Sequence, residues 1–175
     1  IILYQGNMSK ERPLDIFIKA VHHLGNGYAF LALTNSENPY PGIEACNYFH
    51  LPFIAPPYHL EITSHAYIGV LSYVPIKNDY SILNTLYCAP NKTWEYAKFG
   101  VPMIGNDLPA LKMMFCQYGN GICVQDMSVN EVCKAIEQMN EQYDQFRVNS
   151  ERYYKSVDYC QTVKKIIGNS TKEVF

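Results

Sequence analysis

Short runs of apolar residues alternate along the chain with stretches in which apolar residues recur at helical spacing. Six of these runs have the length and the continuous apolar character of strands buried on both faces of a parallel sheet. They lie at residues 1–5, 28–33, 51–54, 67–73, 101–104 and 121–124. The pattern therefore predicts six β-strands separated by helical segments.

Helices are predicted between these strands, and their ends carry stop and cap signals. The first begins near Lys10 or Glu11 and ends at Gly25. Ser128, followed three residues later by Glu131, is a capping box at the start of a later helix. The remaining predicted helices cover residues 42–49, 60–66, 92–99, 108–118, 128–139 and, with polar breaks, 142–167. Residues 77–84 are predicted to form a polar loop.

This alternation predicts an α/β fold: a Rossmann-like, doubly wound parallel sheet of about six strands flanked by helices. Ligands bind such sheets outside the carboxyl ends of the strands, here in the loops after residues 5, 34, 54, 73, 104 and 124. We expect one domain over residues 1–168 and a frayed tail over 169–175. Because a strand opens the chain at Ile1 without a Met or a leader, we expect a further segment or domain upstream.

The amino-acid composition excludes several classes of function. Of 175 residues, 48% are apolar and 17% charged, which provides for a core and does not indicate disorder. A net charge of -2 argues against general nucleic-acid binding, which needs a basic surface. No apolar run approaches the ~20 residues of a membrane span. The cysteines contain no C-x-x-C pair, and we interpret them as buried free thiols in a reducing cytoplasm. They are Cys46, Cys88, Cys116, Cys123, Cys133 and Cys160.

The densest motif is YCAPNKTWEYAKFGVPMIGNDLPAL at residues 87–111. It matches, in order, the signature Pro-Ser/Asn-Lys-x-x-Glu-Tyr-x-x-x-Gly-x-Pro-Val-Ile. The matching residues are Pro90, Asn91, Lys92, Glu95, Tyr96, Gly100, Pro102 and Ile104. On these residues the chain resembles the C-terminal, donor-binding domain of group 1 (family 4-like) glycosyltransferases with the GT-B fold. Weaker matches at 3–6, 12–15 and 119–136 extend the resemblance over roughly residues 1–140.

The resemblance and the chemistry of the side chains together imply a donor-binding site. Glu95 is placed to accept both ribose hydroxyls of a nucleotide, although a lone helical glutamate is usually a surface residue. Gly6, which has no Cβ, would let a diphosphate approach the backbone, and Arg12 would bind it with its guanidinium. The alternative for Arg12 is a solvated side chain in a first helical turn. Lys92, one turn before Glu95, either pairs with it or reaches a phosphate.

Further donor-site positions follow from the same resemblance. The donor-site loop comprises Tyr87, Cys88, Ala89, Pro90 and Asn91, and Asn91 is expected to cap the helix that follows. Backbone groups around Phe53 and Ile54 are expected to contact the nucleobase. The chain departs from the family pattern at two positions. Asn7 stands where a second basic residue is common, and Tyr87 where many members have a glutamate that faces the donor sugar.

Other chemistry-bearing residues give weaker signals. The histidines, including His59 and His65, show no metal-ligand spacing, so we expect core, cap or surface roles for them and no metal site. Trp94, Tyr96 and Phe99 are expected to pack their helix against the sheet. The chain contains no Walker loop, no G-x-S-x-G and no G-x-G-x-x-G motif.

The resemblance implies transfer of a glycosyl group from a nucleotide diphosphate sugar, UDP-sugar above others, to a hydroxyl acceptor. It further implies retention of configuration, no bound cofactor or metal, and a role in surface polysaccharide or glycolipid synthesis. The expected partner is an N-terminal acceptor-binding domain of the same protein. Without it we expect an inactive fragment, and the sequence does not identify the catalytic residues. The expected location is cytoplasmic, with peripheral membrane association open to the full enzyme.

Two other functions remain open at this point: a non-catalytic nucleotide-sugar-binding domain, and a nucleotide-sugar 2-epimerase of the same fold. A flavodoxin-like or response-regulator domain is disfavoured because neither an acidic cluster nor a flavin loop is evident.

Overall fold

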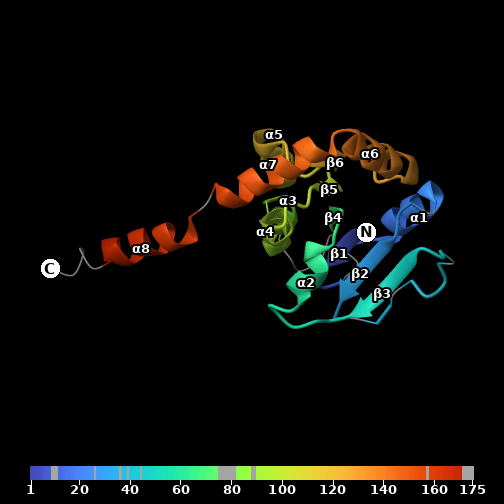
Figure 1. The fold of residues 1–175 in the computed structure, drawn as a ribbon, viewed down its shortest axis with the longest axis horizontal. Helices are drawn as coiled ribbons and strands as arrows, with labels where there is room; N and C mark the ends of the chain where they lie inside the picture. The colour runs from blue at the N-terminus through green and yellow to red at the C-terminus, as the bar shows by residue number, and fades with distance from the viewer. Residues whose placement is uncertain are drawn as a thin grey trace.

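The six strands form one parallel sheet in the order β3-β2-β1-β4-β5-β6 (Figure 1). The computed structural model describes residues 1–8, 12–25, 27–35, 37–38, 40–43, 45–74, 82–87, 90–156 and 158–170. The strands are β1 (Ile2–Gln5), β2 (Phe30–Thr34), β3 (Tyr48–Pro52), β4 (Ile68–Leu71), β5 (Met103–Asn106) and β6 (Gly121–Val124). This topology confirms the predicted doubly wound α/β fold, whose connections leave β1 toward both edges of the sheet.

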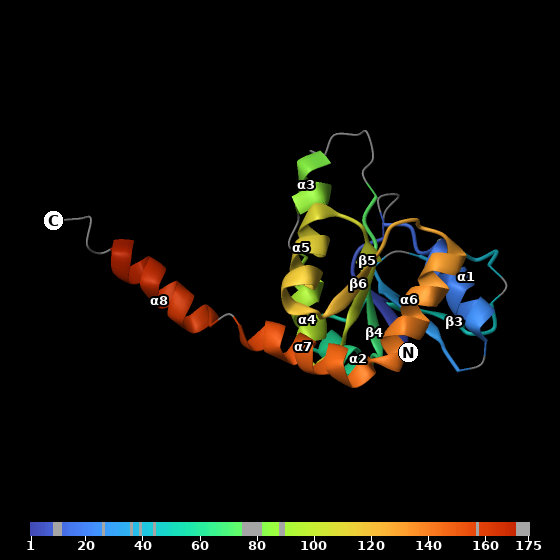
Figure 2. The same ribbon diagram turned by 90° about the horizontal axis from the view of Figure 1, so that it is seen from above.

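Helices cover both faces of the sheet (Figure 2). One layer consists of α1 (Asp15–Leu24) and α6 (Val129–Glu141), which pack against each other. The other layer consists of α2 (His59–Ser64), α3 (Ile82–Tyr87), α4 (Asn91–Lys98) and α5 (Pro109–Tyr118), with α7 (Tyr143–Lys155) packed along α4 and α5. The last helix, α8 (Tyr159–Ser170), extends away from this body (Figure 1).

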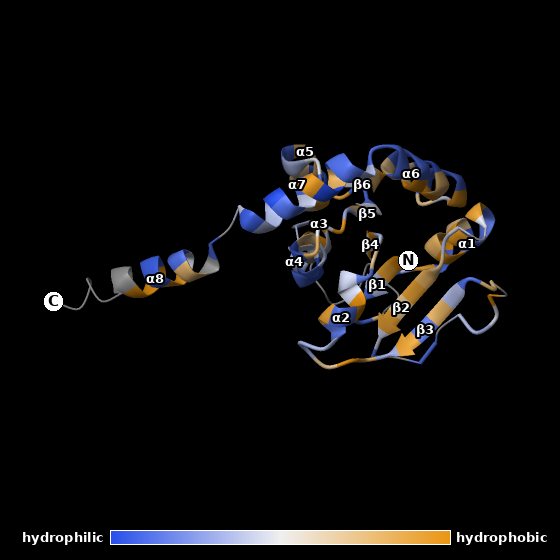
Figure 3. Ribbon diagram, in the orientation of Figure 1, coloured by the Kyte–Doolittle hydropathy of each residue, from blue (hydrophilic) through white to orange (hydrophobic). Residues whose placement is uncertain are grey.

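The central strand β1 is apolar on both sides because each side is covered by a helical layer. Ile2 and Tyr4 belong to the core beneath α1 and α6, whereas Leu3 belongs to the core on the opposite face. Figure 3 shows the resulting band of hydrophobic colour along β1 and β2. Burial on both faces thus explains the continuous apolar runs of the inner strands, such as β1 and β4, whereas the edge strands β3 and β6 are only partly buried.

Helix α4 is seated directly on the sheet through Tyr96, which is fully buried. The Tyr96 hydroxyl donates a hydrogen bond to the backbone oxygen of Leu3 at 2.9 Å. Its ring packs over Gly69 of β4, where an added Cβ would come within 2.4 Å of the ring. This contact fixes the height and rotation of α4, and with them the positions of Lys92 and Glu95.

The structure corrects the prediction of a helix at 42–49. The described residues around Gly42 and Asn47 form turns, and β3 begins at Tyr48, three residues before the predicted strand 51–54. The buried Asn47 amide donates to the backbone oxygens of Val21 and Tyr28 at 2.9 and 3.0 Å. Because these long-range bonds hold the segment against the end of α1 and the start of β2, local helical spacing does not decide its conformation.

The start of α1 is also corrected. The helix begins at Asp15, so Arg12 lies in the segment before it and not in its first turn. Two tertiary hydrogen bonds hold this segment: Ser72 Oγ donates to the Pro13 oxygen at 2.6 Å, and the Leu14 amide donates to the Tyr40 hydroxyl at 2.9 Å. The predicted polar loop 77–84 is corrected at its end, where α3 begins at Ile82, and its earlier part lies outside the described residues.

The prediction of buried cysteines is wrong in part. The five described cysteines are all free, but Cys46, Cys116 and Cys160 are exposed and only Cys133 is buried. Burial raises the pKa of the Cys123 thiol to about 11. Cys88 lies outside the described residues. Within the described part of the chain, every helix is too short or too polar to cross a bilayer.

Candidate functional site

A cavity of about 320 Å³ opens at the carboxyl edge of the sheet, beside the ends of β1 and β4 and the start of α4. This is the point at which the strand order reverses, where doubly wound sheets bind their ligands. Its lining residues are Gln5, Gly6, Arg12, Leu33, Phe53, Ile54, Pro56, His59, Tyr73, Pro90, Asn91, Lys92 and Glu95.

The cavity brings together most of the predicted site residues from three separate parts of the sequence. Gly6 and Arg12 follow β1, Phe53 and Ile54 follow β3, and residues 90–95 come from the start of α4. Tyr87 is the last residue of α3, exposed and not among the lining residues. Cys88 and Ala89 lie outside the described residues.

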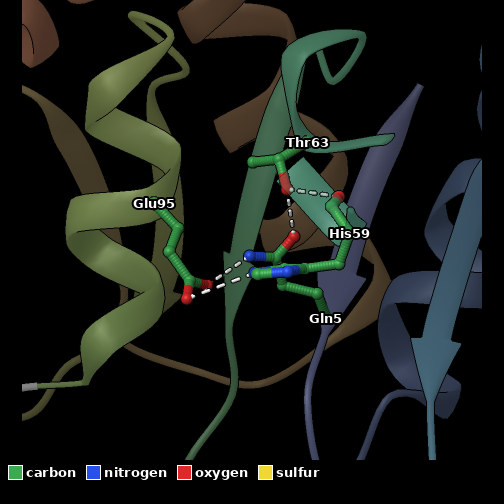
Figure 4. A network of polar contacts seen from close by, with 4 residues as sticks. All are labelled: Gln5, His59, Thr63 and Glu95. Atoms are coloured by element: carbon green, nitrogen blue, oxygen red, sulfur yellow. Dashed lines mark hydrogen bonds and ion pairs between the residues drawn. The ribbon is translucent and has the colours of Figure 1, made fainter. Parts of the chain in front are cut away.

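Glu95 presents a carboxylate to the cavity, and both of its oxygens already accept a contact from the protein (Figure 4). Gln5 Nε2 donates to Oε2 at 2.5 Å, and His59 Nε2 lies 3.3 Å from Oε1. The Glu95 side chain remains 31% exposed. The carboxylate is therefore held in one orientation while part of it still faces solvent.

Two cations line the same cavity and are held by aromatic rings. Lys92 is buried, and its ammonium lies 4.1 Å from the centre of the Tyr4 ring and 5.5 Å from that of Tyr73. The Arg12 guanidinium also lies 5.5 Å from the Tyr73 ring centre, and it donates to the Asn7 oxygen at 3.1 Å. Ring faces attract cations without neutralising them. Both positively charged side chains therefore line the cavity, where they favour an anionic ligand.

The aromatic residues that contact these cations are themselves held by hydrogen bonds. Asn106, at the end of β5, accepts a hydrogen bond from the Tyr73 backbone amide at its Oδ1, 3.0 Å away, and its Nδ2 donates to the Tyr73 backbone oxygen. Burial raises the pKa of Tyr4 to about 12, so its neutral hydroxyl donates to the Asn7 oxygen at 2.6 Å. Gly6 has φ +119°, a conformation that L side chains rarely adopt, and Lys92 Nζ would lie 3.4 Å from a Cβ there.

An apolar wall completes the cavity. It is formed by Leu33 at the end of β2 and by Phe53, Ile54 and Pro56 after β3. Phe53 is 60% exposed, so its ring is accessible to a ligand in the cavity. The cavity thus combines a cationic region, a carboxylate and an apolar surface. That combination suits a ligand that carries an anionic group, hydroxyls and a flat apolar ring. Within the described residues, no cluster of three or more His, Cys, Asp or Glu side chains could hold a metal ion.

Sequence reasoning missed three lining residues that take part in the contacts above. His59 was expected in a core, cap or surface role, but it lies in the cavity and contacts Glu95. Gln5 and Tyr73 also line the cavity. Their positions carried a usable signal, because Gln5 and Tyr73 end predicted strands at the carboxyl edge and His59 lies in the segment after the third.

Two expected roles in α4 are also corrected. Asn91 does not cap the helix: it is the first helical residue, and the N-cap is Pro90, whose side chain makes no capping hydrogen bond. Trp94 does not pack against the sheet but stacks on Tyr153 of α7, with ring centres 4.8 Å apart. Helix α4 is therefore held between the sheet, through Tyr96, and α7, through Trp94.

No protein-family model and no curated protein matches the chain. Solved structures match it over most of its length. Pneumococcal O-GlcNAc transferase GtfA, solved with UDP and GlcNAc, is 15% identical, and the match covers 98% of this chain and 35% of GtfA with a TM-score of 0.74. Anabaena HepE, solved with UDP and glucose, is 11% identical, with 99% of this chain and 48% of HepE covered and a TM-score of 0.73.

A third match is to a separately solved domain. The C-terminal domain of the group 1 glycosyl transferase LpcC from Francisella tularensis is 12% identical, with 88% of this chain and 82% of that domain covered and a TM-score of 0.63. The chain has the fold of a GT-B C-terminal domain. It spans less than half of the GtfA and HepE chains, and the fold confirms the resemblance that residues 87–111 suggested.

Proposed function

We propose that this GT-B domain binds the nucleoside diphosphate of a nucleotide-sugar donor, UDP-sugar above others, and is the donor half of a glycosyltransferase. The observation that carries the proposal is the convergence of Glu95, Arg12, Lys92 and Gly6 on one cavity at the switch point of the sheet. GtfA and HepE, which share the fold, were solved with UDP.

Each region of the cavity would take one part of the ligand. The Glu95 carboxylate would accept the ribose hydroxyls, and Phe53 and Ile54 would contact the nucleobase. Arg12 and Lys92 would neutralise the diphosphate beside the backbone of Gly6, with the guanidinium suited to contact two phosphate oxygens at once. Pro90 and Asn91, at the start of α4, would lie beside the same ligand. Tyr87 is exposed at the end of α3 and does not line the cavity, so any contact that it makes with the ligand would lie outside the cavity.

Catalysis would need a second domain. Glu95 is the only carboxylate among the described residues that line the cavity, and its proposed role is ribose binding. We propose that an N-terminal acceptor-binding domain of the same protein supplies the other catalytic groups, so the 175-residue chain alone transfers nothing. Retention of configuration, a cytoplasmic location and a role in polysaccharide or glycolipid synthesis belong to the same proposal.

Thermal-shift measurements with UDP, GDP, ADP and TDP test donor binding directly. A ligand at a hundred times its Kd should stabilise the chain by about 2.7 kcal/mol. Glu95→Ala should then weaken binding of the stabilising nucleotide by about ten- to a hundredfold, since it removes hydrogen bonds to a charged group.

Glu61→Ala is the matched control, because Glu61 is an exposed carboxylate on α2 that does not line the cavity. The Glu61→Ala variant should bind the stabilising nucleotide with the same affinity as the unmodified chain. The proposal fails if none of the four nucleotides raises the melting temperature at millimolar concentration.

A further inference from the structure

The contacts of Glu95 continue behind it into a buried chain of hydrogen bonds (Figure 4). Gln5, which is 4% exposed, bridges Glu95 on α4 and Thr63 on α2. Thr63 is fully buried, and its hydroxyl donates to Gln5 Oε1 at 2.7 Å. The Thr63 hydroxyl also lies 3.1 Å from the backbone oxygen of His59, one turn earlier. One side chain at the end of β1 thereby connects the two helices that border the cavity.

Chemistry fixes the direction of this chain. An ionised carboxylate only accepts hydrogen bonds, so the Gln5 amide must present its NH2 group to Glu95. Its oxygen then faces Thr63, whose hydroxyl has a proton to give. Each donor therefore points toward Glu95, and the amide cannot flip without leaving a buried polar atom unpaired, which costs about 1–3 kcal/mol.

His59 holds the other oxygen of the carboxylate. It is the first residue of α2, its side chain is 13% exposed, and its Nε2 faces Glu95 Oε1. A carboxylate accepts about four hydrogen bonds, two at each oxygen. Gln5 donates to Oε2, and His59 Nε2 lies 3.3 Å from Oε1, so both oxygens retain acceptor capacity, which the 31% exposed part of the side chain presents to the cavity.

Two acceptor positions side by side on a fixed plane match two hydroxyls on adjacent carbons. We propose that Gln5, His59 and Thr63 are positioning residues that orient the Glu95 carboxylate, so that the site selects ribonucleoside over 2′-deoxyribonucleoside diphosphates. This inference rests on the proposed function, since it assumes that Glu95 binds the ribose. A site built to bond a hydroxyl disfavours the analogue that lacks it, because its polar groups are then left unpaired.

The test is calorimetric titration of the 175-residue chain and its variants with UDP and with 2′-deoxy-UDP. The unmodified chain should prefer UDP by about ten- to a hundredfold, the range expected for a hydrogen bond to a charged group. His59→Phe and Thr63→Val keep the shape of each side chain but remove its donor. Each should lose most of this preference, because it weakens UDP binding, which uses both hydroxyl contacts, more than 2′-deoxy-UDP binding, which keeps only the 3′-hydroxyl contact.

Conservative replacements and same-helix controls separate positioning from folding. His59→Gln and Thr63→Ser retain a donor and should restore much of the preference. His65→Phe is the control for His59→Phe, because His65 is the C-cap of α2 and pairs with Glu61, and neither of these two residues lines the cavity. Ser64→Ala is the control for Thr63→Val, because the Ser64 hydroxyl is exposed and bonds only its own helix at Glu61. Both controls should keep the full preference for UDP.

The outcomes distinguish this inference from the proposed function. If Glu95→Ala abolishes the preference while His59→Phe and Thr63→Val keep it, the positioning role is wrong and donor binding stands. Equal weakening of both nucleotides with a lower melting temperature would show a purely structural role and would also overturn the inference. If the unmodified chain does not bind UDP, or if Glu95→Ala binds it unchanged, the proposed function fails and the inference fails with it.

Discussion

At the scale of single residues, Glu95 and Arg12 are held at the cavity by two different kinds of electrostatic interaction. Glu95 accepts a short hydrogen bond from Gln5 and lies 3.3 Å from His59 Nε2, so its orientation is set by close contacts with neighbouring side chains. Arg12 is held by the Tyr73 ring and one backbone oxygen, so its charge remains directed at the cavity. Hydrogen bonds between close partners depend little on ionic strength, whereas the attraction between a cation and an anionic ligand is screened by salt. The two residues should therefore respond differently to salt.

Arg12→Ala should weaken UDP binding more than uridine binding, because only UDP carries the diphosphate. The loss relative to the unmodified chain should shrink as salt rises from about 0.01 M to 1 M, where the screening length falls from about 30 to 3 Å. Calorimetric titration with UDP, UMP and uridine at several salt concentrations measures both effects. Lys19→Ala is the control, since Lys19 is an exposed cation on α1 that pairs with Asp15. An Arg12→Ala variant with the UDP affinity and salt slope of the unmodified chain would remove Arg12 from the site.

At the scale of elements, the position of α4 depends on its contact with β4. Tyr96 can lie flat on the sheet because Gly69 has no side chain, and its hydroxyl reaches the Leu3 oxygen. On the outer side, Trp94 stacks on Tyr153 of α7. Because Lys92 and Glu95 lie on the same helix, the packing of Tyr96 and Trp94 positions the functional side chains.

Gly69→Ala should therefore destabilise the fold and the site together. The new Cβ would come within 2.4 Å of the Tyr96 ring, so the ring and α4 must move. Overpacking of this kind costs about 1–3 kcal/mol, which should appear as a lower melting temperature and a weaker affinity for UDP. Gly42→Ala is the matched control, because no atom lies within 4 Å of its added Cβ, and it should change neither quantity. Equal stability of the two variants would show that α4 is not held by this contact.

At the scale of the whole molecule, the C-terminal helices differ in their relation to the body. Helix α7 packs along α4 and α5, and Tyr153 also meets the Tyr118 ring edge-on. Helix α8 extends outward (Figure 1), and Val163, Ile166 and Ile167 are among its exposed residues. The stability of the body should thus depend on α7 but not on α8.

A chain that ends after Ser156 should keep the melting temperature and the UDP affinity of the full chain, because it loses only α8 and the residues next to it. A chain that ends after Gln142 also loses α7 and should melt earlier, since Trp94 loses its stacking partner Tyr153. Trp94 is the only tryptophan in the sequence, so its fluorescence should shift to longer wavelength in the shorter chain alone. A large loss of stability in the longer chain would show that α8 supports the body.

The strengths and failures of the sequence predictions have separate physical causes. The central strand β1 was predicted within one residue, because a run buried on both faces must be apolar throughout. The edge strand β6 was predicted with its exact bounds, although it is only partly buried. Ser128 was correctly predicted as a cap, since it accepts from the Glu131 amide, and such a bond is local in sequence. The error at residues 42–49 arose where Asn47 bonds the backbones of Val21 and Tyr28.

The sequence alone determined the class of the sheet, its exposed carboxyl edge and the residue types of a donor site, because periodicity, caps and the motif at 87–111 are local properties of the chain. Only the tertiary structure placed Gln5 and His59 against Glu95 and set both cations on the Tyr73 ring. Gln5 and Glu95 are 90 positions apart. Contacts over such separations depend on how β1, α2 and α4 pack together, and no local pattern in the chain encodes that packing.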